Sequence, residues 1–329
     1  MRCTNKKKRI VAALLASVLV LPLAGCSAAP ALENAFEADR PGLGVTASLD
    51  GGEGISYFAE DLCVVDENVE AIEADTSEAL AACFFDMDSL EVLYAKNVHD
   101  RMYPASTTKI MTALVALEHG DLDAQATVSE TAVTFHESGV TTAHLKTGDM
   151  LTLRQLLYAL LVCSANDAAN VIAEQVGGSI EGFVDMMNEE AARIGATNTH
   201  FTNPHGLHDE EHYTTAYDMY LMFQEALKQD LFREILETPV YETSYLSADG
   251  SQVEASWSSS NLFTKGEVTV PEGVTAVGGK TGTTTAAMSC LVQLFEDAEG
   301  KSYAAIILGC SERAILYQEM QSFLSSLNN

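Results

Sequence analysis

A serine and a lysine three residues apart, Ser106 and Lys109, are the first candidates for chemistry in this chain. They follow Pro104 at the predicted start of a helix, where residues i and i+3 lie on one face. An amine beside a hydroxyl can take the hydroxyl proton and create a nucleophile, provided that burial or nearby cations lower the pKa of the amine. About one Ser-x-x-Lys pattern is expected by chance in a chain of this length, so the pair alone has little specificity.

A second serine and a second lysine accompany this pair. Ser164 lies two residues before Asn166 between two predicted helices, where a hydroxyl could relay a proton and an amide could hold a substrate carbonyl. Lys280 and Thr281 precede a glycine on a predicted strand and could bind an anionic group. Each pattern recurs, Ser-x-Asn at 259–261 and 326–328 and Lys-Thr-Gly at 146–148 in an expected turn. Chain order and local context favour Ser164 and Lys280 as the partners of Ser106.

The elements that must position these residues alternate between two periodicities. A helix is predicted from near Ser106 to Gly120, and residues 150 to 240 are mostly helical, with Thr152, Ser179 and Thr215 as predicted N-caps. Strands are predicted at 81–87, 91–95, 278–285, 288–295 and 302–308, and a closing helix at 312–327. This order predicts an α/β chain of the α+β type, an antiparallel sheet flanked by helices.

The first 25 residues have the pattern of an export signal. A basic segment at 2–9 precedes an apolar run at 10–23, which is shorter than the roughly 20 residues that span a bilayer as a helix. The run ends in Leu-Ala-Gly before Cys26, which resembles a bacterial lipobox. We therefore expect a lipoprotein signal peptide at 1–25 and a lipid on Cys26, which would hold the exported protein on the outer face of the cytoplasmic membrane.

The charge of the chain excludes one class of partner. The whole sequence has 18 basic and 47 acidic residues, a net charge of −29, and removal of the signal leaves a net charge of −34. Such a surface repels phosphate backbones, which argues against general nucleic-acid binding. An anionic peptide end would also be repelled unless a local cation bound it, and Lys280, among uncharged and mostly small residues, is well placed for that.

The rest of the mature chain divides into two predicted parts. Residues 26–78 are predicted as a tether and a poorly defined N-terminal extension, and residues 79–329 as a catalytic domain with a helical subdomain at about 120–240. The mature chain keeps five cysteines besides Cys26, an odd number, so at least one has no partner within the chain. Their pairing stays open: Cys63, Cys83, Cys163, Cys290 and Cys310.

Taken together, the motifs resemble the serine D-alanyl-D-alanine carboxypeptidases, the low-molecular-mass penicillin-binding proteins. The similarity extends from about Ala79 to Ser326 and is carried by residues 103–114, 164–169, 203–207 and 279–283. It implies a β-lactamase/transpeptidase-like fold. It also implies peptidoglycan stem peptides ending in D-Ala-D-Ala as substrates and β-lactam antibiotics as acylating inhibitors, with no metal or organic cofactor.

The resemblance assigns a role to each matching residue. Ser106 attacks the peptide bond and forms an acyl-enzyme, Lys109 accepts its proton, and Ser164 relays a proton to the leaving amine. Asn166 holds the substrate amide, and Lys280 and Thr281 bind the terminal carboxylate. The backbone N–H groups of Ser106 and Thr283 form the oxyanion hole, although the family often has a ring-bearing side chain where this chain has Thr283.

Several alternatives remain open at this stage. A β-lactamase of the same fold would need a second base, and Glu174 lies in a predicted helix without the usual supporting loop. A DD-endopeptidase and a non-catalytic penicillin-binding lipoprotein would share the motifs. A metal site at His205, His208 and His212 is disfavoured because proline and glycine interrupt the helical spacing. Many family members end in a further domain and a membrane helix; here the N-terminal lipid is expected to replace that anchor.

Overall fold

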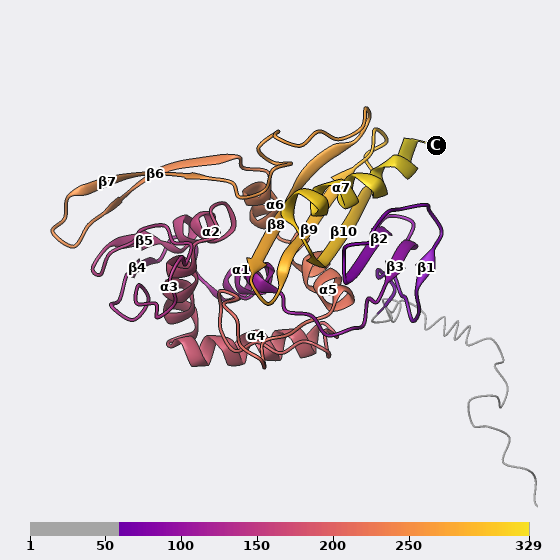
Figure 1. Cartoon of the computed structure of the whole chain (residues 1–329). Coiled ribbons are helices and arrows are strands. Elements are labelled where there is room, and N and C mark those ends of the chain that lie inside the picture. Colours follow the sequence, from indigo (N-terminus) through magenta and orange to yellow (C-terminus); the bar gives the residue numbers. More distant parts are fainter. Residues whose placement is uncertain (1–58, 329) are drawn as a thin grey trace, which may run out of the picture. The chain divides into compact units, whose positions relative to one another are not determined.

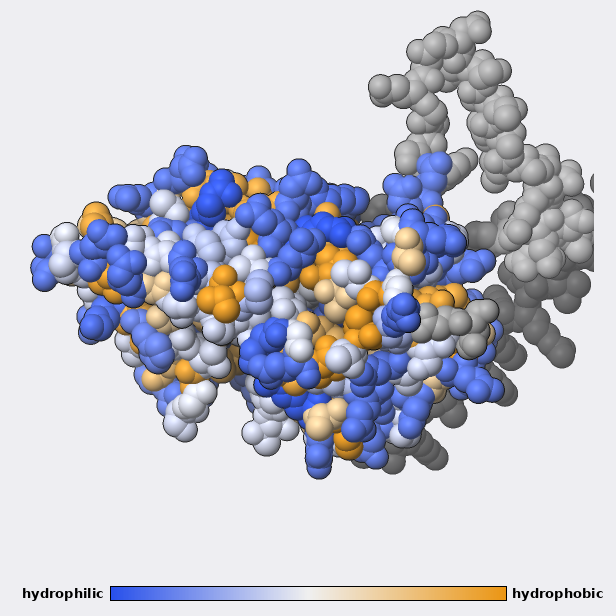
Figure 2. Space-filling model, turned by 90° about the horizontal axis from the view of Figure 1, so that it is seen from above, coloured by the Kyte–Doolittle hydropathy of each residue, from blue (hydrophilic) through white to orange (hydrophobic). Residues whose placement is uncertain are grey.

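The computed structural model describes residues 59–328, and these belong to one compact unit. The predicted signal peptide and Cys26 lie outside the described residues. None of the helices within 59–328 is both long enough and apolar enough to cross a bilayer. Figure 2 shows a face on which hydrophilic residues predominate and hydrophobic residues form small, separate groups.

An antiparallel six-stranded sheet forms the centre of the domain, with strand order β1-β3-β2-β10-β9-β8. The predicted hairpin at 81–95 and the three predicted C-terminal strands are confirmed. Alternate side chains of β2 enter different cores, since Phe84 packs with Phe323 of α7 (Arg313–Leu324) and Phe85 packs with Tyr220 of α5 (Ala216–Leu227). The sheet is therefore covered on both faces (Figure 1). The strands are β1 (Val69–Glu70), β2 (Ala81–Asp86), β3 (Glu91–Lys96), β8 (Thr275–Thr284), β9 (Met288–Glu296) and β10 (Ser302–Cys310).

The helices occupy the middle of the chain and its end. The predicted N-caps are confirmed: the side chains of Thr152, Ser179 and Thr215 each accept a hydrogen bond from a backbone N–H in the first turn of their helix. A short 3₁₀ turn, η1 (Ala105–Thr108), leads into α1 and carries the first candidate serine. The helices are α1 (Lys109–His119), α2 (Leu153–Leu161), α3 (Asn166–Gly177), α4 (Ile180–Arg193), α5 (Ala216–Leu227), α6 (Asp230–Leu236) and α7 (Arg313–Leu324), followed by η2 (Ser325–Asn328).

A second sheet, which the sequence pattern did not predict, has the order β4-β5-β6-β7. Its hairpin of β6 and β7 extends away from the main sheet in Figure 1. The hairpin is anchored on α2 because the ring of Tyr241 stacks on Tyr158 at 3.8 Å and on Trp257 at 5.9 Å, between ring centroids. The strands are β4 (Gln125–Thr127), β5 (Met150–Thr152), β6 (Val240–Leu246) and β7 (Gln252–Ser258).

The folded domain begins before the predicted boundary at residue 79. Cys63 is fully buried, and its backbone N–H donates to the Tyr220 hydroxyl at 2.9 Å. Strand β1 also extends the main sheet by pairing with β3. The described residues 59–78 therefore belong to the folded unit, where the sequence predicted only a poorly defined extension. The cause is that their partners are remote, 157 positions away for Cys63, and no local pattern reveals such contacts.

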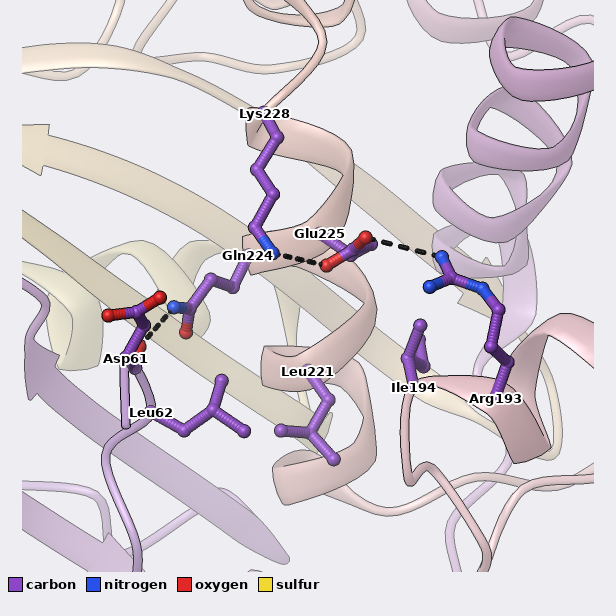
Figure 3. Close-up of a pocket in the computed structure, with 8 residues that line it drawn as sticks. All are labelled: Asp61, Leu62, Arg193, Ile194, Leu221, Gln224, Glu225 and Lys228. Atoms are coloured by element: carbon purple, nitrogen blue, oxygen red, sulfur yellow. Dashed lines mark hydrogen bonds and ion pairs between the residues drawn. The ribbon is translucent and has the colours of Figure 1, made fainter. Parts of the chain in front are cut away.

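A pocket of about 220 Å³ lies between this N-terminal segment and helices α4 and α5 (Figure 3). The Gln224 side chain donates to the carbonyl of Asp61, and Glu225 pairs with both Arg193 and Lys228. None of the lining residues belongs to the predicted site. The pocket therefore marks where residues 61–62 pack against the helices.

Candidate active site

The structure brings Ser106 and Lys109 together at the junction of η1 and α1. The Nζ atom of Lys109 lies 3.0 Å from Ser106 Oγ. Lys109 is fully buried, whereas Ser106 is partly exposed and can meet a ligand. Burial lowers the pKa of Lys109 well below its usual range, and the positive charge of Lys280 lowers it further. Both effects favour the uncharged amine, the form that can accept a proton.

The other contacts of Lys109 decide which way its lone pair points. Its Nζ lies 2.6 Å from Asn166 Oδ1 and 2.6 Å from the carbonyl oxygen of His205. Both oxygen atoms can only accept, so they take the two N–H groups of a neutral amine. The lone pair then faces the Ser106 hydroxyl, which is the arrangement that a general base requires.

Ser164 and Lys280 form the second half of the same site. Ser164 joins α2 to α3 with φ at 64°, and its Oγ accepts a hydrogen bond from Lys280 Nζ at 2.9 Å. The same Nζ donates to the carbonyl of Thr281 at 2.8 Å. Lys280 is fully buried, and burial lowers its pKa to about 7. This ammonium can therefore bind an anion and also lowers the pKa of Lys109 by repulsion.

Strand β8 runs directly against η1. A Cβ atom on Gly282 would lie 2.8 Å from the carbonyl oxygen of Pro104 and 3.1 Å from the backbone nitrogen of Ser106. Only glycine permits this approach without a shift of the backbone. Thr283, the next residue, is exposed at the end of the strand, and its hydroxyl donates to the Gly282 carbonyl at 2.7 Å.

Two residues that sequence reasoning missed lie beside Thr281. The hydroxyls of Ser260 and Thr281 are 2.7 Å apart, and the Arg313 guanidinium donates to the Ser260 carbonyl. Arg313 is exposed at the start of α7, so it adds a positive charge beside Ser260. A lone serine after a hairpin and a lone arginine after a strand carry no spacing signal that could have identified them.

A third missed residue, Asp167, holds one wall of the site. Its carboxylate accepts from the backbone N–H groups of Ala143 at 2.9 Å and Leu145 at 3.0 Å. The neighbouring backbone N–H of Asn166 donates to Thr141 at 2.9 Å. Burial raises the pKa of Asp167, although the N–H donors oppose this shift. The signal available in the sequence was an acid in the first turn of a predicted helix, directly after Asn166.

The loop at 203–207 packs on the other side of the nucleophile. Thr112 of α1 donates to the Pro204 carbonyl at 2.6 Å, and the His205 carbonyl accepts from Lys109. Burial lowers the pKa values of His205 and His212 to about 3. Within 59–328 no group of three or more His, Cys, Asp or Glu side chains is arranged to hold a metal ion.

The competing motif copies lie elsewhere. The Lys-Thr-Gly copy at 146–148 forms a turn with Gly148 at φ 90°, as predicted. The Asn261 side chain is buried against Gln293, 2.7 Å away, and the copy at 326–328 lies in η2. Glu174 accepts from Ser129 Oγ at 2.8 Å. It lies eight residues beyond Asn166 in α3, about 12 Å along the helix axis.

The cysteine pairing, which the sequence left open, is answered for the described residues. Cys63, Cys83, Cys290 and Cys310 are buried free thiols, and the half-buried Cys163 is free as well. Cys163 directly precedes Ser164, and burial raises its pKa to about 12, so it is a neutral thiol at physiological pH.

Comparison with known proteins finds relatives that share one description. The D-alanyl-D-alanine carboxypeptidase DacF of Bacillus subtilis is 39% identical over 158 residues, which are 46% of this chain and 40% of that protein. DacB2 of Mycobacterium tuberculosis, of the same description, is 36% identical over 211 residues, or 63% of this chain and 67% of the relative. The match thus spans less than half of the Bacillus protein and about two thirds of the mycobacterial one.

Solved structures and the family pattern agree with these relatives. The crystal structure of the Streptomyces K15 DD-transpeptidase superposes with a TM-score of 0.71 at 28% identity, covering 77% of this chain and 98% of that one. A model of the peptidase family S11, described as D-alanyl-D-alanine carboxypeptidase, matches residues 68–311. This chain therefore belongs to the D-alanyl-D-alanine carboxypeptidase family of serine peptidases.

Proposed function

We propose that this chain removes the terminal D-alanine from peptidoglycan stem pentapeptides through an acyl-enzyme on Ser106, and that β-lactams acylate the same serine. The observation that carries the proposal is the contact of 3.0 Å between Ser106 Oγ and the buried amine of Lys109, whose pKa burial holds well below its usual range. A serine hydroxyl is a weak nucleophile unless such a base takes its proton. The family membership of the chain supports the same activity.

The first half of the reaction uses both parts of the site. Ser106 Oγ forms a bond to the carbonyl carbon of the penultimate D-alanine as its proton moves to Lys109 Nζ. The carbon–nitrogen bond then breaks, and the leaving D-alanine amine takes a proton from the Ser164 hydroxyl, which is restored from Lys109. Lys280, 2.9 Å from Ser164 Oγ, stabilises the negative charge that develops during this transfer.

Binding depends on charge and on backbone donors. Lys280, Arg313 and the Thr281 hydroxyl are proposed to bind the terminal carboxylate, which the net charge of −29 would otherwise repel. Asn166 is proposed to hold the substrate amide. The N–H groups of Ser106 and Thr283 are proposed as the oxyanion hole, a contribution of about 3 to 4 kcal/mol per donor in other serine enzymes.

Water or an amine can complete the reaction. Hydrolysis of the ester gives carboxypeptidase activity, whereas attack by an amino group gives the transpeptidase activity named for the Streptomyces K15 neighbour. Rapid β-lactam hydrolysis would need a base beside the ester, and Glu174 is bonded to Ser129 about two helical turns from Asn166. We therefore propose slow turnover of β-lactams.

Labelling with a fluorescent penicillin tests the assignment. The purified protein should bind the label covalently and release D-alanine from a synthetic pentapeptide, and Ser106→Ala should do neither. Product analysis with and without an amine acceptor separates hydrolysis from transfer, and a crosslinked dimer tests endopeptidase activity. A folded wild-type protein that reacts with neither penicillin nor D-Ala-D-Ala peptides would refute the proposal.

We further propose that a lipid on Cys26 anchors the exported protein to the outer face of the cytoplasmic membrane. The support is the sequence pattern of residues 1–26. Membrane fractionation of cells producing the full chain should find the wild type with membranes and Cys26→Ala released. Equal retention of both proteins would contradict the anchor.

A further inference from the structure

The peptide unit that precedes the proposed nucleophile has an unusual conformation. Ala105 is buried with φ at 49°, in the left-handed region that residues with a Cβ rarely adopt. A trans peptide is planar, so its C=O and N–H groups point in opposite directions. Whatever fixes the Ala105 carbonyl therefore also fixes the Ser106 N–H, the proposed donor of the oxyanion hole.

A threonine hydroxyl holds that carbonyl. Thr108 Oγ1 donates to the Ala105 carbonyl oxygen at 2.8 Å and lies 2.8 Å from Nε2 of His212. A hydroxyl has one hydrogen atom, and here it is used on the carbonyl. His212 must therefore donate its Nε2–H to Thr108. Both side chains are buried, with exposed fractions of 0% and 2%.

The contact of the other ring nitrogen of His212 is consistent with donation from Nε2 to Thr108. The backbone N–H of Thr202 donates to His212 Nδ1 at 3.0 Å, so Nδ1 must be the unprotonated acceptor. The imidazole is therefore neutral, with its hydrogen on Nε2. Burial lowers the pKa of His212 to about 3, which keeps the ring in this form at physiological pH. The edge-on contact with Phe201, at 5.5 Å between centroids, fixes the plane of the ring.

The loop at 203–207 closes the remaining space around the peptide. A Cβ on Gly206 would lie 1.9 Å from the Ala105 carbonyl oxygen and 2.8 Å from Thr108 Oγ1. Gly206 itself has φ at 86°, which favours glycine. The carbonyl is thus packed against backbone on one side and hydrogen-bonded to Thr108, which leaves the peptide one orientation.

We propose that His212 and Thr108 are positioning residues that orient the Ser106 N–H toward the substrate carbonyl, through a hydrogen-bond chain from Thr202 N–H to the Ala105 carbonyl. Neither side chain touches the substrate. The inference rests on the proposed function, in which Ser106 is acylated and its N–H stabilises the oxyanion. It assigns a role to a histidine that the sequence suggested only as a disfavoured metal ligand.

The decisive experiment compares Thr108→Val with Thr108→Ser. Valine keeps the volume and removes the hydroxyl, whereas serine keeps the hydroxyl. Stopped-flow acylation by a fluorescent penicillin should slow about tenfold to hundredfold in Thr108→Val, because loss of an oxyanion-hole donor costs about 10² to 10³ in rate and misorientation costs part of that. Thr108→Ser should retain most of the wild-type rate.

A spectroscopic measurement separates positioning from general structural damage. Infrared difference spectra of the acyl-enzyme, with the ester carbonyl labelled with ¹³C, report hydrogen bonding to that oxygen. The band should move to higher wavenumber in Thr108→Val and stay at the wild-type position in Thr108→Ser. A change in thermal stability alone would not move this band in the acylated protein.

A second pair of variants covers the case in which Thr108→Val does not fold. His212→Phe keeps the ring shape and removes the donor, whereas His212→Gln can still donate to Thr108. The phenylalanine variant should show the slower acylation and the shifted band, and the glutamine variant should be closer to wild type. Wild-type rates and an unshifted band in Thr108→Val or His212→Phe would overturn the inference, whereas an unreactive wild type would instead refute the proposed function.

Discussion

The helix side and the strand side of the site hold their lysines differently. On the helix side, Lys109 meets three oxygen atoms, and two of them, Asn166 Oδ1 and the His205 carbonyl, can only accept. On the strand side, Lys280 meets the Ser164 hydroxyl and its neighbour's carbonyl. A neutral amine has two hydrogen atoms and an ammonium has three. The first environment directs a lone pair at Ser106, and the second keeps one N–H for a ligand.

The difference shows how the charge of one lysine lowers the pKa of the other. Both side chains are fully buried, and burial is the main cause of the lowered pKa in each. Repulsion from Lys280 is the second cause for Lys109. The strand-side cation thus favours the uncharged state of the helix-side base, which divides the roles of base and anion binder between two residues of the same type.

The largest expected effect comes from removing the base. Lys109→Arg keeps a long side chain with N–H donors, but a guanidinium does not lose its proton in proteins and cannot act as a base. We expect acylation by penicillin to fall by about 10² to 10⁴, in line with the loss of general base catalysis. Stopped-flow labelling measures the rate, and circular dichroism checks the fold. Rapid acylation by a folded Lys109→Arg protein would show that another group takes the proton.

Removing the strand-side cation should have a smaller effect on substrates that carry a carboxylate. For Lys280→Met we expect kcat/KM on a pentapeptide to fall by about 10² or more, because the variant loses an ion pair and the ammonium that lowers the pKa of Lys109. Lys280→Arg is the matched control, since it restores a cation. If the methionine and arginine variants were equally impaired, charge would not be the function of this residue.

The stability of Lys280→Met provides an independent check. The pKa of Lys280 falls from 10.5 to about 7 on folding, so the unfolded chain binds more protons between these pH values and stability rises with pH there. The free-energy cost of burying the charged Lys280 is complete below pH 7 and absent above pH 10.5. Lys280→Met has no such cost. The difference between its free energy of unfolding and that of wild type should therefore be about 3 kcal/mol more favourable to the variant at pH 6 than at pH 9. Urea unfolding at both pH values measures this; equal gains would mean that Lys280 is not a buried cation.

Local signals explain which parts of the structure the sequence predicted. The caps Thr152, Ser179 and Thr215 and the strands of the main sheet were predicted because periodicity and capping are local properties. The three motifs also met as expected, although their spacing alone could not show it. Their recurrence elsewhere in the chain meant that chain order and the family resemblance had to select the right copies.

Long-range contacts explain most of what was missed. The β6–β7 hairpin alternates exposed and half-buried residues, many of them Ser, Thr or Glu, so it lacks the apolar signal of a core strand. Arg313 and Ser260 reach the site through one hydrogen bond between segments 53 residues apart. The approach of β8 to η1 at Gly282 depends on two elements separated by the whole helical region.

The pH dependence of kcat/KM tests whether the two lysines titrate in opposite senses. Activity should rise as the free enzyme loses the Lys109 proton, whose pKa is far below its usual value. It should fall again as Lys280 loses its ammonium above a pKa of about 7, by about tenfold per pH unit. In Lys280→Arg the alkaline limb should move to higher pH while the acid limb remains. An unchanged alkaline limb in that variant would assign it to a different group.

The smallest expected effect concerns the contact that joins the two sides. In Gly282→Ala the new Cβ would lie 2.8 Å from the Pro104 carbonyl, so β8 must move by a few tenths of an ångström away from η1. Overpacking of this kind costs about 1 to 3 kcal/mol. We expect acylation to slow by about tenfold, because Lys280 and the Thr283 N–H move away from Ser106 while Lys109 keeps its three partners on the helix side. Lys109 should then keep its hydrogen bonds and its pKa, so the acid limb of the pH profile should coincide with that of wild type. A displaced acid limb would show that the strand and helix sides are coupled more tightly than through the charge of Lys280 alone.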